Sequence, residues 1–353
     1  MHCLYILLNE AKNRTGTGVA DDVNKRLALH NAGRVKASRP YRPYNIIHTE
    51  EFETLKGAMQ ITKHVHALKI PFQITVASGL VVDRFVYIYL ICGGKIGLID
   101  TGVSGSKKII FDYLKSIDRE PQEISDIILT HSHPDHIGSA KSIKEASGCS
   151  LSIHSAEKSW IENVELQFRE RSVPGFHSLV EGSVEVDRAF EDGDVIKLTN
   201  DLELEIFHTP GHSKGSASFF LKNDGALFCG DAILLPGQMP IFEDFRSCIN
   251  SVNKLMKING VKVLFSSWDV PQEGERVSVL MGESLSYLRE IHEAVKVVAA
   301  SKLSSDAMEL CKQVIGKLKL PISMANPLVA RSFQSILNVQ NSRDTILNYY
   351  DKT

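Results

Sequence analysis

Short apolar runs recur between residues 72 and 270, and they are rich in β-branched and aromatic residues, as strands are. Two of the turns between them read Gly-Gly and Asn-Asp-Gly, which predicts hairpins. The amphipathic segment 106–117 predicts a helix. The predicted strands and hairpins are residues 85–92, 95–102, 126–131, 147–155, 201–213, 216–231 and 261–267. Many strands with interspersed helices predict an α+β fold in which helices cover two sheets, an αββα sandwich.

The two ends of the chain have different patterns. Residues 1–70 predict a small α+β domain that ends near Pro71, with strands at 3–8 and 42–52 and helices at 21–33 and 54–68. Residues 273–353 predict a helical C-terminal region with helices at 282–301, 305–318 and 326–339. Residues 71–272 form the middle domain, and its segment 164–190, which fits neither pattern, is interpreted as an insertion over the site described below.

Composition excludes some classes of protein. The 353 residues are 43% hydrophobic and 23% charged with a net charge of −2, so the whole chain is no polyelectrolyte. Residues 1–70, however, carry 11 Lys and Arg against 6 Asp and Glu. The six cysteines form no Cys-x-x-Cys pair, and we see neither an export signal nor a membrane-spanning run. We therefore expect a cytoplasmic protein with reduced thiols and no membrane partner, and its oligomeric state stays open.

The stretch "THSHPDHIGS", residues 130–139, concentrates ligand chemistry. His131 and His133 follow a predicted strand and point the same way in an extended segment, so they could share one ion. Pro134 then turns the chain, and Asp135 and His136 can face a neighbouring position. Imidazole and carboxylate groups suit zinc, iron or manganese.

Two further candidates stand on loops that follow predicted strands, where a rigid sheet usually positions functional residues. His212 lies in the turn "TPGHSKGS", and Asp231 ends the strand "LFCGD". A carboxylate at Asp231 could bridge two ions.

H-x-H-x-D-H, "TPGHSKGS" and "LFCGD", in this order over residues 72–270, resemble the metallo-β-lactamase superfamily. The resemblance implies a first metal site of His131, His133 and His212. It implies a second site of Asp135, His136 and Asp231, with Asp231 shared and Asp135 also assisting catalysis by moving a proton. Asp100 in "IDTG" would orient this site without binding the ion itself.

The chain departs from that family at one place. Members usually carry a last histidine after the final sheet strand, but here the sequence reads "VLFSSWDVP" and contains no histidine between His212 and His292. Asp269 is a further candidate ligand, and Trp268 could form a wall of the pocket. If Asp269 does not bind, the second site lacks one ligand.

Residues 3–69 resemble a GIY-YIG nuclease domain, with Tyr5 and Arg26 in two of that family's catalytic places. Gly16 and Gly57 stand near where the family has its second tyrosine and its metal-binding glutamate. The resemblance therefore implies a degenerate, inactive domain. Its basic stretch of Arg34, Lys36, Arg39 and Arg42 could still bind nucleic acid.

The leading hypothesis is a metal-dependent hydrolase that uses a metal-bound hydroxide, with one or two Zn²⁺ ions (or Fe or Mn), on a small-molecule ester, thioester, lactone or phosphodiester. One alternative is a mononuclear iron oxygenase on the same fold. Another is a protein that binds or processes nucleic acid through residues 1–70. The fold alone does not name the substrate.

Overall fold

The computed structural model describes residues 2–9, 14–20, 23–35, 38, 40, 42–52, 57–75, 79, 81–199, 201–301 and 306–340. The chain divides into two compact units, Met1–Met59 and Gln60–Thr353, and each is described by itself. The predicted boundary at Pro71 differs from this division, since Pro71 lies inside a strand of the second unit, β5 (Val65–Thr75).

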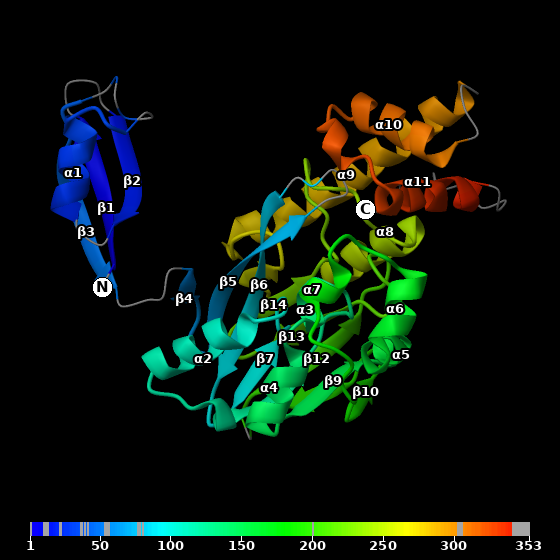
Figure 1. The fold of residues 1–353 in the computed structure, drawn as a ribbon, viewed down its shortest axis with the longest axis horizontal. Helices are drawn as coiled ribbons and strands as arrows, with labels where there is room; N and C mark the ends of the chain where they lie inside the picture. Colours follow the sequence, from blue (N-terminus) through cyan, green and yellow to red (C-terminus); the bar gives the residue numbers. More distant parts are fainter. Residues whose placement is uncertain are drawn as a thin grey trace. The chain divides into compact units, whose positions relative to one another are not determined.

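The first unit is a three-stranded antiparallel sheet with one helix, in the order β2-β1-β3 (Figure 1). Its elements are β1 (His2–Asn9), β2 (Arg14–Ala20), α1 (Val23–Asn31) and β3 (Asn45–Phe52). The two predicted strands and the first predicted helix are found here. The strand β2, "RTGTGVA", was not predicted, because it contains two glycines and few apolar residues.

The helix predicted over 54–68 is wrong in the part that the structure describes. That part contains β4 (Ala58–Gln60) and the start of β5. The first four residues of β5, Val65–Leu68, are all buried, so the segment lacks the alternation of a strand with one exposed face. The apolar residues of such a strand can mimic helical spacing.

The second unit contains two sheets whose inner faces form its core. The seven-stranded sheet has the order β10-β9-β8-β7-β6-β5-β4, and the six-stranded sheet has the order β11-β12-β13-β14-β15-β16. In the first sheet the remaining strands are β6 (Val81–Cys92), β7 (Ile96–Ile99), β8 (Ile124–Ile128), β9 (Ser150–His154) and β10 (Arg188–Phe190). The second sheet consists of β11 (Val195–Lys197), β12 (Glu203–His208), β13 (Ala217–Leu221), β14 (Ala226–Gly230), β15 (Val263–Ser266) and β16 (Gln272–Glu273).

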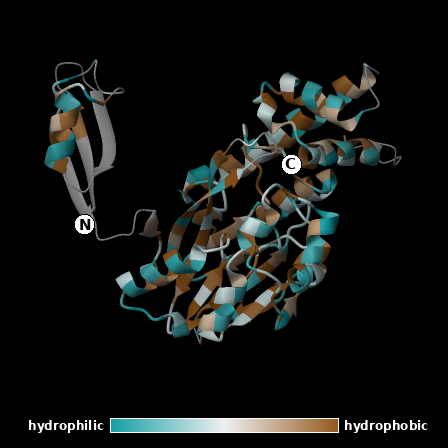
Figure 2. Ribbon diagram, in the orientation of Figure 1, coloured by the Kyte–Doolittle hydropathy of each residue, from teal (hydrophilic) through white to brown (hydrophobic). Residues whose placement is uncertain are grey.

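Aromatic side chains join the two sheets. The ring of Tyr89 in β6 lies 5.4 Å from Phe228 in β14 and 5.0 Å from Phe265 in β15. All three belong to one buried hydrophobic cluster drawn from both sheets. Figure 2 colours many residues of these central strands as hydrophobic. Burial of this apolar surface is the main force that holds the sheets together.

Helices cover the outer faces. On the seven-stranded sheet, α2 (Ser106–Ser116) contacts β5 and α4 (Ala140–Ser147) contacts β8. On the six-stranded sheet, α8 (Phe245–Leu255) and α9 (Glu275–Ala300) share a buried cluster with β13, β14 and β15. The predicted αββα sandwich is therefore confirmed.

Shorter helices and the C-terminal helices complete the second unit. The segment interpreted as an insertion contains α6 (Val164–Glu170) and α7 (Phe176–Leu179) and ends in β10. The C-terminal α10 (Ala307–Lys317) and α11 (Pro327–Gln340) pack with α9 against α8. The remaining short helices are α3 (Pro134–Ile137), α5 (Lys158–Glu162), η3 (Pro121–Glu123), η4 (Ser155–Glu157) and η5 (Ile322–Met324). Among the helices that the structure describes, none has the length and apolar character needed to cross a bilayer.

A carboxylate in a turn of one sheet is hydrogen-bonded to residues in a loop of the other sheet. Asp224, in the turn between β13 and β14, accepts hydrogen bonds from His64 N at 2.9 Å, from His64 Nδ1 at 2.6 Å and from the Thr62 hydroxyl. Thr62 and His64 precede β5, and only 2% of the Asp224 side chain is exposed. Burial alone would raise the pKa of Asp224, but these hydrogen bonds outweigh it and lower that pKa.

Replacing Asp224 with asparagine is expected to lower the free energy of unfolding by about 1–3 kcal/mol at pH 7, because the half-buried donors of Thr62 and His64 lose their charged acceptor. Because the pKa is lowered in the folded state, the carboxylate contributes fully above its unfolded value of about 3.9, and the contribution is lost as pH falls through the folded value. Denaturant unfolding of both proteins at pH 7 and near pH 3 checks this. A difference that stays constant with pH would contradict it.

Candidate metal centre

Three histidines come from one loop at the carboxyl end of β8. His131 and His133 follow the strand, and His136 lies on α3, which begins at Pro134. β8 is a central strand between β7 and β9, so the sheet holds this loop rigidly. The three residues are 1%, 3% and 0% exposed, respectively, so the imidazoles lie in the interior.

Two loops of the other sheet bring further groups. His212 follows β12 in a turn where Gly211 has a φ of 133°, and a Cβ there would lie 2.5 Å from Cys248 N. Asp231 follows β14 directly after Gly230, whose φ is 51°. Both turns therefore need glycine next to the functional residue.

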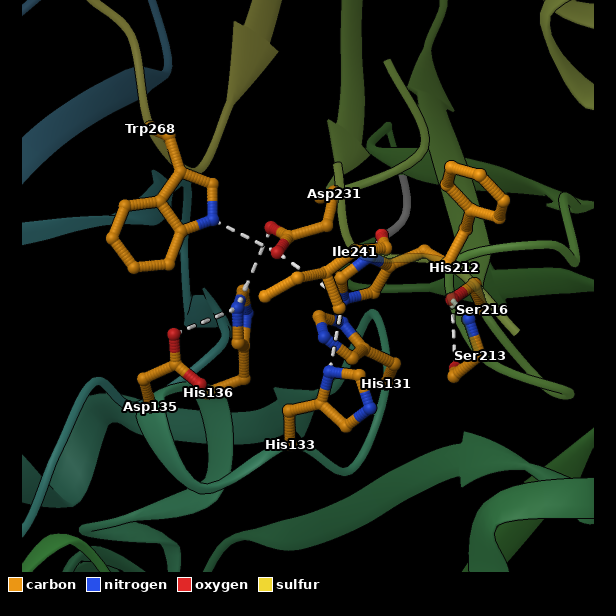
Figure 3. A network of polar contacts seen from close by, with 12 residues as sticks. His131, His133, Asp135, His136, His212, Ser213, Ser216, Asp231, Ile241 and Trp268 are labelled. Carbon is orange, nitrogen blue, oxygen red and sulfur yellow. Dashed lines mark hydrogen bonds and ion pairs between the residues drawn. The ribbon is translucent and has the colours of Figure 1, made fainter. Parts of the chain in front are cut away.

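The ligand atoms of these loops converge, although they are far apart in sequence (Figure 3). His212 Nε2 lies 2.9 Å from His133 Nδ1 and 3.3 Å from Asp231 Oδ2, and His136 Nε2 lies 3.5 Å from Asp231 Oδ1. Two groups bring three ligand atoms each within 4.8 Å of one another. They are His131, His133 and His212, and His131, His136 and Asp231.

The polar atoms of the centre fit a cation. The Nε2 atoms of His131, His133 and His136 are buried without a hydrogen-bond partner, and so is Asp231 Oδ1. Polar atoms that are buried without a hydrogen bond cost about 1–3 kcal/mol each. Two of these four, His136 Nε2 and Asp231 Oδ1, face each other as an ion pair at 3.5 Å. A divalent ion bound by nitrogen and oxygen donors would satisfy several of them at once, and this donor set suits zinc.

Asp100 holds the imidazoles in position. Its carboxylate accepts hydrogen bonds from Thr130 N, Thr130 Oγ1 and His136 Nδ1, each at 2.8 Å. Thr130 Oγ1 in turn lies 3.0 Å from His131 Nδ1 and can accept from it. With their Nδ1 protons engaged, His131 and His136 direct Nε2 towards the centre. His212 is oriented similarly by Ile241 O, 3.0 Å from its Nδ1.

Burial and neighbouring charges shift the pKa values of these histidines in different directions. Burial, followed by the neighbouring His136, lowers the pKa of His131 well below its usual range, and burial followed by Arg171 does the same for His133. Burial opposes protonation of His136 too, but Asp100, Asp231 and Asp135 outweigh it and raise its pKa to about 10. An ion bound at His136 must therefore displace a proton.

Two predicted site residues lie outside the two groups. Asp135 Oδ2 is 3.7 Å from His136 Nε2, and its side chain is 20% exposed. Asp269 accepts hydrogen bonds from Val270 N at 2.8 Å and from Gln272 Nε2 at 3.2 Å, within its own turn. The neighbouring Trp268 does reach the centre, since its Nε1 donates to Asp231 Oδ2 at 2.8 Å.

Sequence reasoning missed a buried carboxylate that links the histidine loops. Glu157, 2% exposed, accepts from the Ser132 hydroxyl, from Ser213 Oγ at 2.7 Å and from Gly215 N at 2.7 Å. Ser132 stands between His131 and His133, and Ser213 follows His212. Gln167 of α6 donates to Ser132 O at 2.6 Å, so the segment 164–190 does reach this loop. Glu157 closely follows β9, the type of position that identified the other candidates.

The residues compared with a nuclease site lie in the first unit. Tyr5 is on β1, opposite Gly18 of β2 and Thr49 of β3, and its side chain is outside the described part. Arg26 is on α1 and partly exposed. Gly16 pairs with Leu7, and Gly57 precedes β4 with a φ of 99°.

Comparison with known protein families shows to which family the chain belongs. The family model for the metallo-beta-lactamase superfamily matches residues 81–267, which include every candidate ligand of the metal centre except Asp269. The chain belongs to the metallo-beta-lactamase superfamily. A second model, the GIY-YIG catalytic domain, matches residues 1–67. Both resemblances read from the sequence are therefore confirmed.

Curated relatives of this superfamily are similar over part of their length. The hydroxyacylglutathione hydrolase of Methylococcus capsulatus is 24% identical over 61% of this chain and 74% of its own. That of Buchnera aphidicola is 28% identical over 50% and 59%. The probable metallo-hydrolase YqgX of Bacillus subtilis is 29% identical over 42% and 66%. The chain thus covers between about three fifths and three quarters of the length of these relatives. They support the predicted enzyme class, a metallohydrolase.

Solved structures share the fold. A metallo-beta-lactamase family protein from Thermus thermophilus has a TM-score of 0.59 at 19% identity, over 78% of this chain and 94% of that one. A class B3 di-zinc metallo-beta-lactamase from an Alaskan soil metagenome has a TM-score of 0.51 at 17% identity, over 67% and 93%. At these identities the likeness shows the fold alone.

Proposed function

We propose that this chain is a metal-dependent hydrolase that cleaves a thioester or a related activated ester of a small molecule. The observation that carries the proposal is the convergence of imidazole nitrogens and a carboxylate oxygen from loops of both sheets, several of them buried without a hydrogen bond. Such atoms destabilise the fold unless a cation satisfies them. They are therefore better explained by metal binding than by packing.

The residues of the centre would have separate roles in metal binding and proton transfer. His131, His133 and His212 would bind the ion, with Asp231 and His136 beside it. A bound divalent ion, for which zinc is our first choice, lowers the pKa of a coordinated water and so supplies a hydroxide nucleophile near neutral pH. Asp135, partly exposed and 3.7 Å from His136, would take up the proton and deliver it to the leaving group.

The substrate class rests on the curated relatives. Two of those compared are named hydroxyacylglutathione hydrolases, and acyl-glutathiones are thioesters. A thiolate is a good leaving group, so this reaction needs little more than a positioned nucleophile and a site for the developing oxyanion. Lactones, oxygen esters and phosphodiesters are the other classes that the same chemistry can attack.

A substrate panel with controlled metal content tests the proposal. Protein purified without chelator is assayed against an acyl-glutathione, a nitrophenyl ester, a lactone and a nitrophenyl phosphodiester. We expect thiol release from the thioester, its loss on removal of the ion with a chelator, and its return with zinc. Hydrolysis that survives complete metal removal would contradict the proposal, as would inactivity on all four classes after reloading with zinc, manganese or iron.

A mononuclear iron oxygenase is a second candidate, because three imidazoles around one position suit a single iron. Measuring metal identity together with oxygen consumption separates the two. Iron in the purified protein and substrate-dependent oxygen uptake would favour an oxygenase over a hydrolase.

Nucleic-acid binding by residues 1–70 stays a prediction. Of its basic stretch, Arg34 and Arg42 are described, whereas Lys36 and Arg39 lie outside the described residues. The inactivity proposed for this unit rests on Gly16 and Gly57 in the places of a tyrosine and a glutamate.

A further inference from the structure

The loops of the metal centre form a ring of strand ends, and one member of this ring differs from the others. β7 is followed by Asp100, β8 by His131, β12 by His212 and β14 by Asp231. β15 runs parallel to β14, with Ser266 paired to Gly230. Its end therefore lies beside Asp231, and it brings both Ser267 and Trp268 to that carboxylate.

Trp268 contributes a hydrogen-bond donor, whereas the residues at the other strand ends contribute imidazole or carboxylate groups. Its Nε1 lies 2.8 Å from Asp231 Oδ2, and Figure 3 shows the indole directed at that carboxylate. An indole N–H can only donate and has no lone pair for a metal. The ring is packed against Phe85 of β6, with the centroids 6.4 Å apart, which keeps it in this place.

The two candidate ligand groups also compete with each other. Both contain His131, whose Nδ1 faces Thr130 and whose Nε2 alone faces the centre. One nitrogen lone pair binds one ion, so the two groups cannot both be filled. Without His131, the second position keeps His136 and Asp231, and Asp231 already accepts from Trp268. Asp135 Oδ2 lies 3.7 Å from His136 Nε2 but belongs to neither group of ligand atoms that lie within 4.8 Å of one another. Asp269, the other residue near this place, is engaged in its own turn.

We infer that the centre holds a single metal ion, bound by His131, His133 and His212, and that Trp268 fixes this number by taking the place of a second-ion ligand. The inference rests on the proposed function, in that a metal must bind at all. Three protein ligands around one ion leave a position for water or substrate, as in other catalytic zinc sites.

The matched pair Trp268→His and Trp268→Phe tests this. The five-membered ring of histidine places a nitrogen near the position of the indole nitrogen, so Trp268→His adds a ligand. Trp268→Phe only removes the donor. We expect one zinc per chain in the wild type and in Trp268→Phe, and two in Trp268→His, by plasma mass spectrometry after saturation and removal of free metal.

Cobalt loading gives a second readout that does not depend on activity. Stepwise addition of cobalt to the metal-free proteins is expected to saturate the visible absorption after one equivalent in the wild type and after two in Trp268→His. Circular dichroism checks that each variant is folded.

Two outcomes overturn the inference and leave the function intact: two ions per wild-type chain with hydrolysis present, or a folded Trp268→His protein that still binds one ion. If Trp268→His does not fold, the counts for the wild type and Trp268→Phe decide. A wild type that binds no ion, even when saturated, would instead overturn the proposed function and the inference with it.

Discussion

Replacing His131 with alanine is expected to abolish high-affinity metal binding and to lower hydrolysis by about a thousandfold or more. His131 is the member common to both ligand groups. Its ring lies 4.4 Å from that of His133, 4.0 Å from His136 and 4.9 Å from His212. Its loss leaves only two ligands in either group.

The size of the effect follows from the chemistry of the ion. A bound ion contributes several kilocalories per mole of transition-state stabilisation, and each 1.36 kcal/mol changes the rate about tenfold. The fold should suffer less than the activity. His131 Nε2 is buried without a partner, so its removal relieves an unpaired polar atom while leaving a small cavity.

Thermal unfolding with and without zinc separates these effects. Zinc should raise the melting temperature of the wild type, because it binds the native state, and should leave that of His131→Ala unchanged. His177→Ala is a suitable control, since it also removes an imidazole but from a side chain that is 57% exposed and paired with Glu165. Zinc binding by His131→Ala with wild-type affinity would exclude His131 as a ligand.

The site could be predicted from the sequence where its residues cluster or follow recognisable strands. Four ligand-type residues fall between His131 and His136, and the apolar run before them predicts the strand that holds them. His212 and Asp231 are revealed by the same rule, because each follows an alternating or apolar strand and a glycine. A short strand with strong β propensity is a local pattern of residues, so it can be recognised from a single sequence.

What could not be predicted depends on contacts between distant residues. Glu157 is a single acidic residue in "HSAEKSW", and its importance appears only when Ser132 and Ser213 are brought to it. Asp269 had the right chemistry for a ligand, but its side chain turns back to Val270 and Gln272. The sequence places both Trp268 and Asp269 after β15 and cannot say which of them faces the centre, because that depends on how the turn packs.

Glu157 links the two halves of the candidate ligand set. Its carboxylate accepts a hydrogen bond from Ser132, which stands between His131 and His133 on a loop of the seven-stranded sheet. It also accepts from Ser213 and Gly215, which follow His212 on a loop of the six-stranded sheet. It therefore sets the separation of loops whose His133 and His212 ring nitrogens lie only 2.9 Å apart. Carboxylates that hold ligand loops in place typically affect metal affinity about 10–100-fold without touching the ion.

Replacing Glu157 with glutamine is therefore expected to weaken zinc binding by about 10–100-fold and to lower the free energy of unfolding of the metal-free protein by about 1–3 kcal/mol. Glutamine has nearly the same shape, but its amide can accept at only one atom, so it leaves at least one donor of Ser213, Gly215 or Ser132 unpaired. Competition with a chromophoric chelator measures the affinity, and denaturant unfolding measures the stability.

Glu181→Gln supplies the matched control for this variant. Glu181 also gathers several donors, Gly105 N at 3.2 Å, Ser139 Oγ at 3.3 Å and Ser142 N at 3.2 Å, but its carboxylate accepts no hydrogen bond from residues 131–136 or 212–215. Its replacement should lower stability and leave zinc affinity near that of the wild type. If both variants change stability and neither changes affinity, Glu157 only supports the fold. A selective loss of affinity in Glu157→Gln would instead identify it as the residue that positions the two ligand loops around one ion.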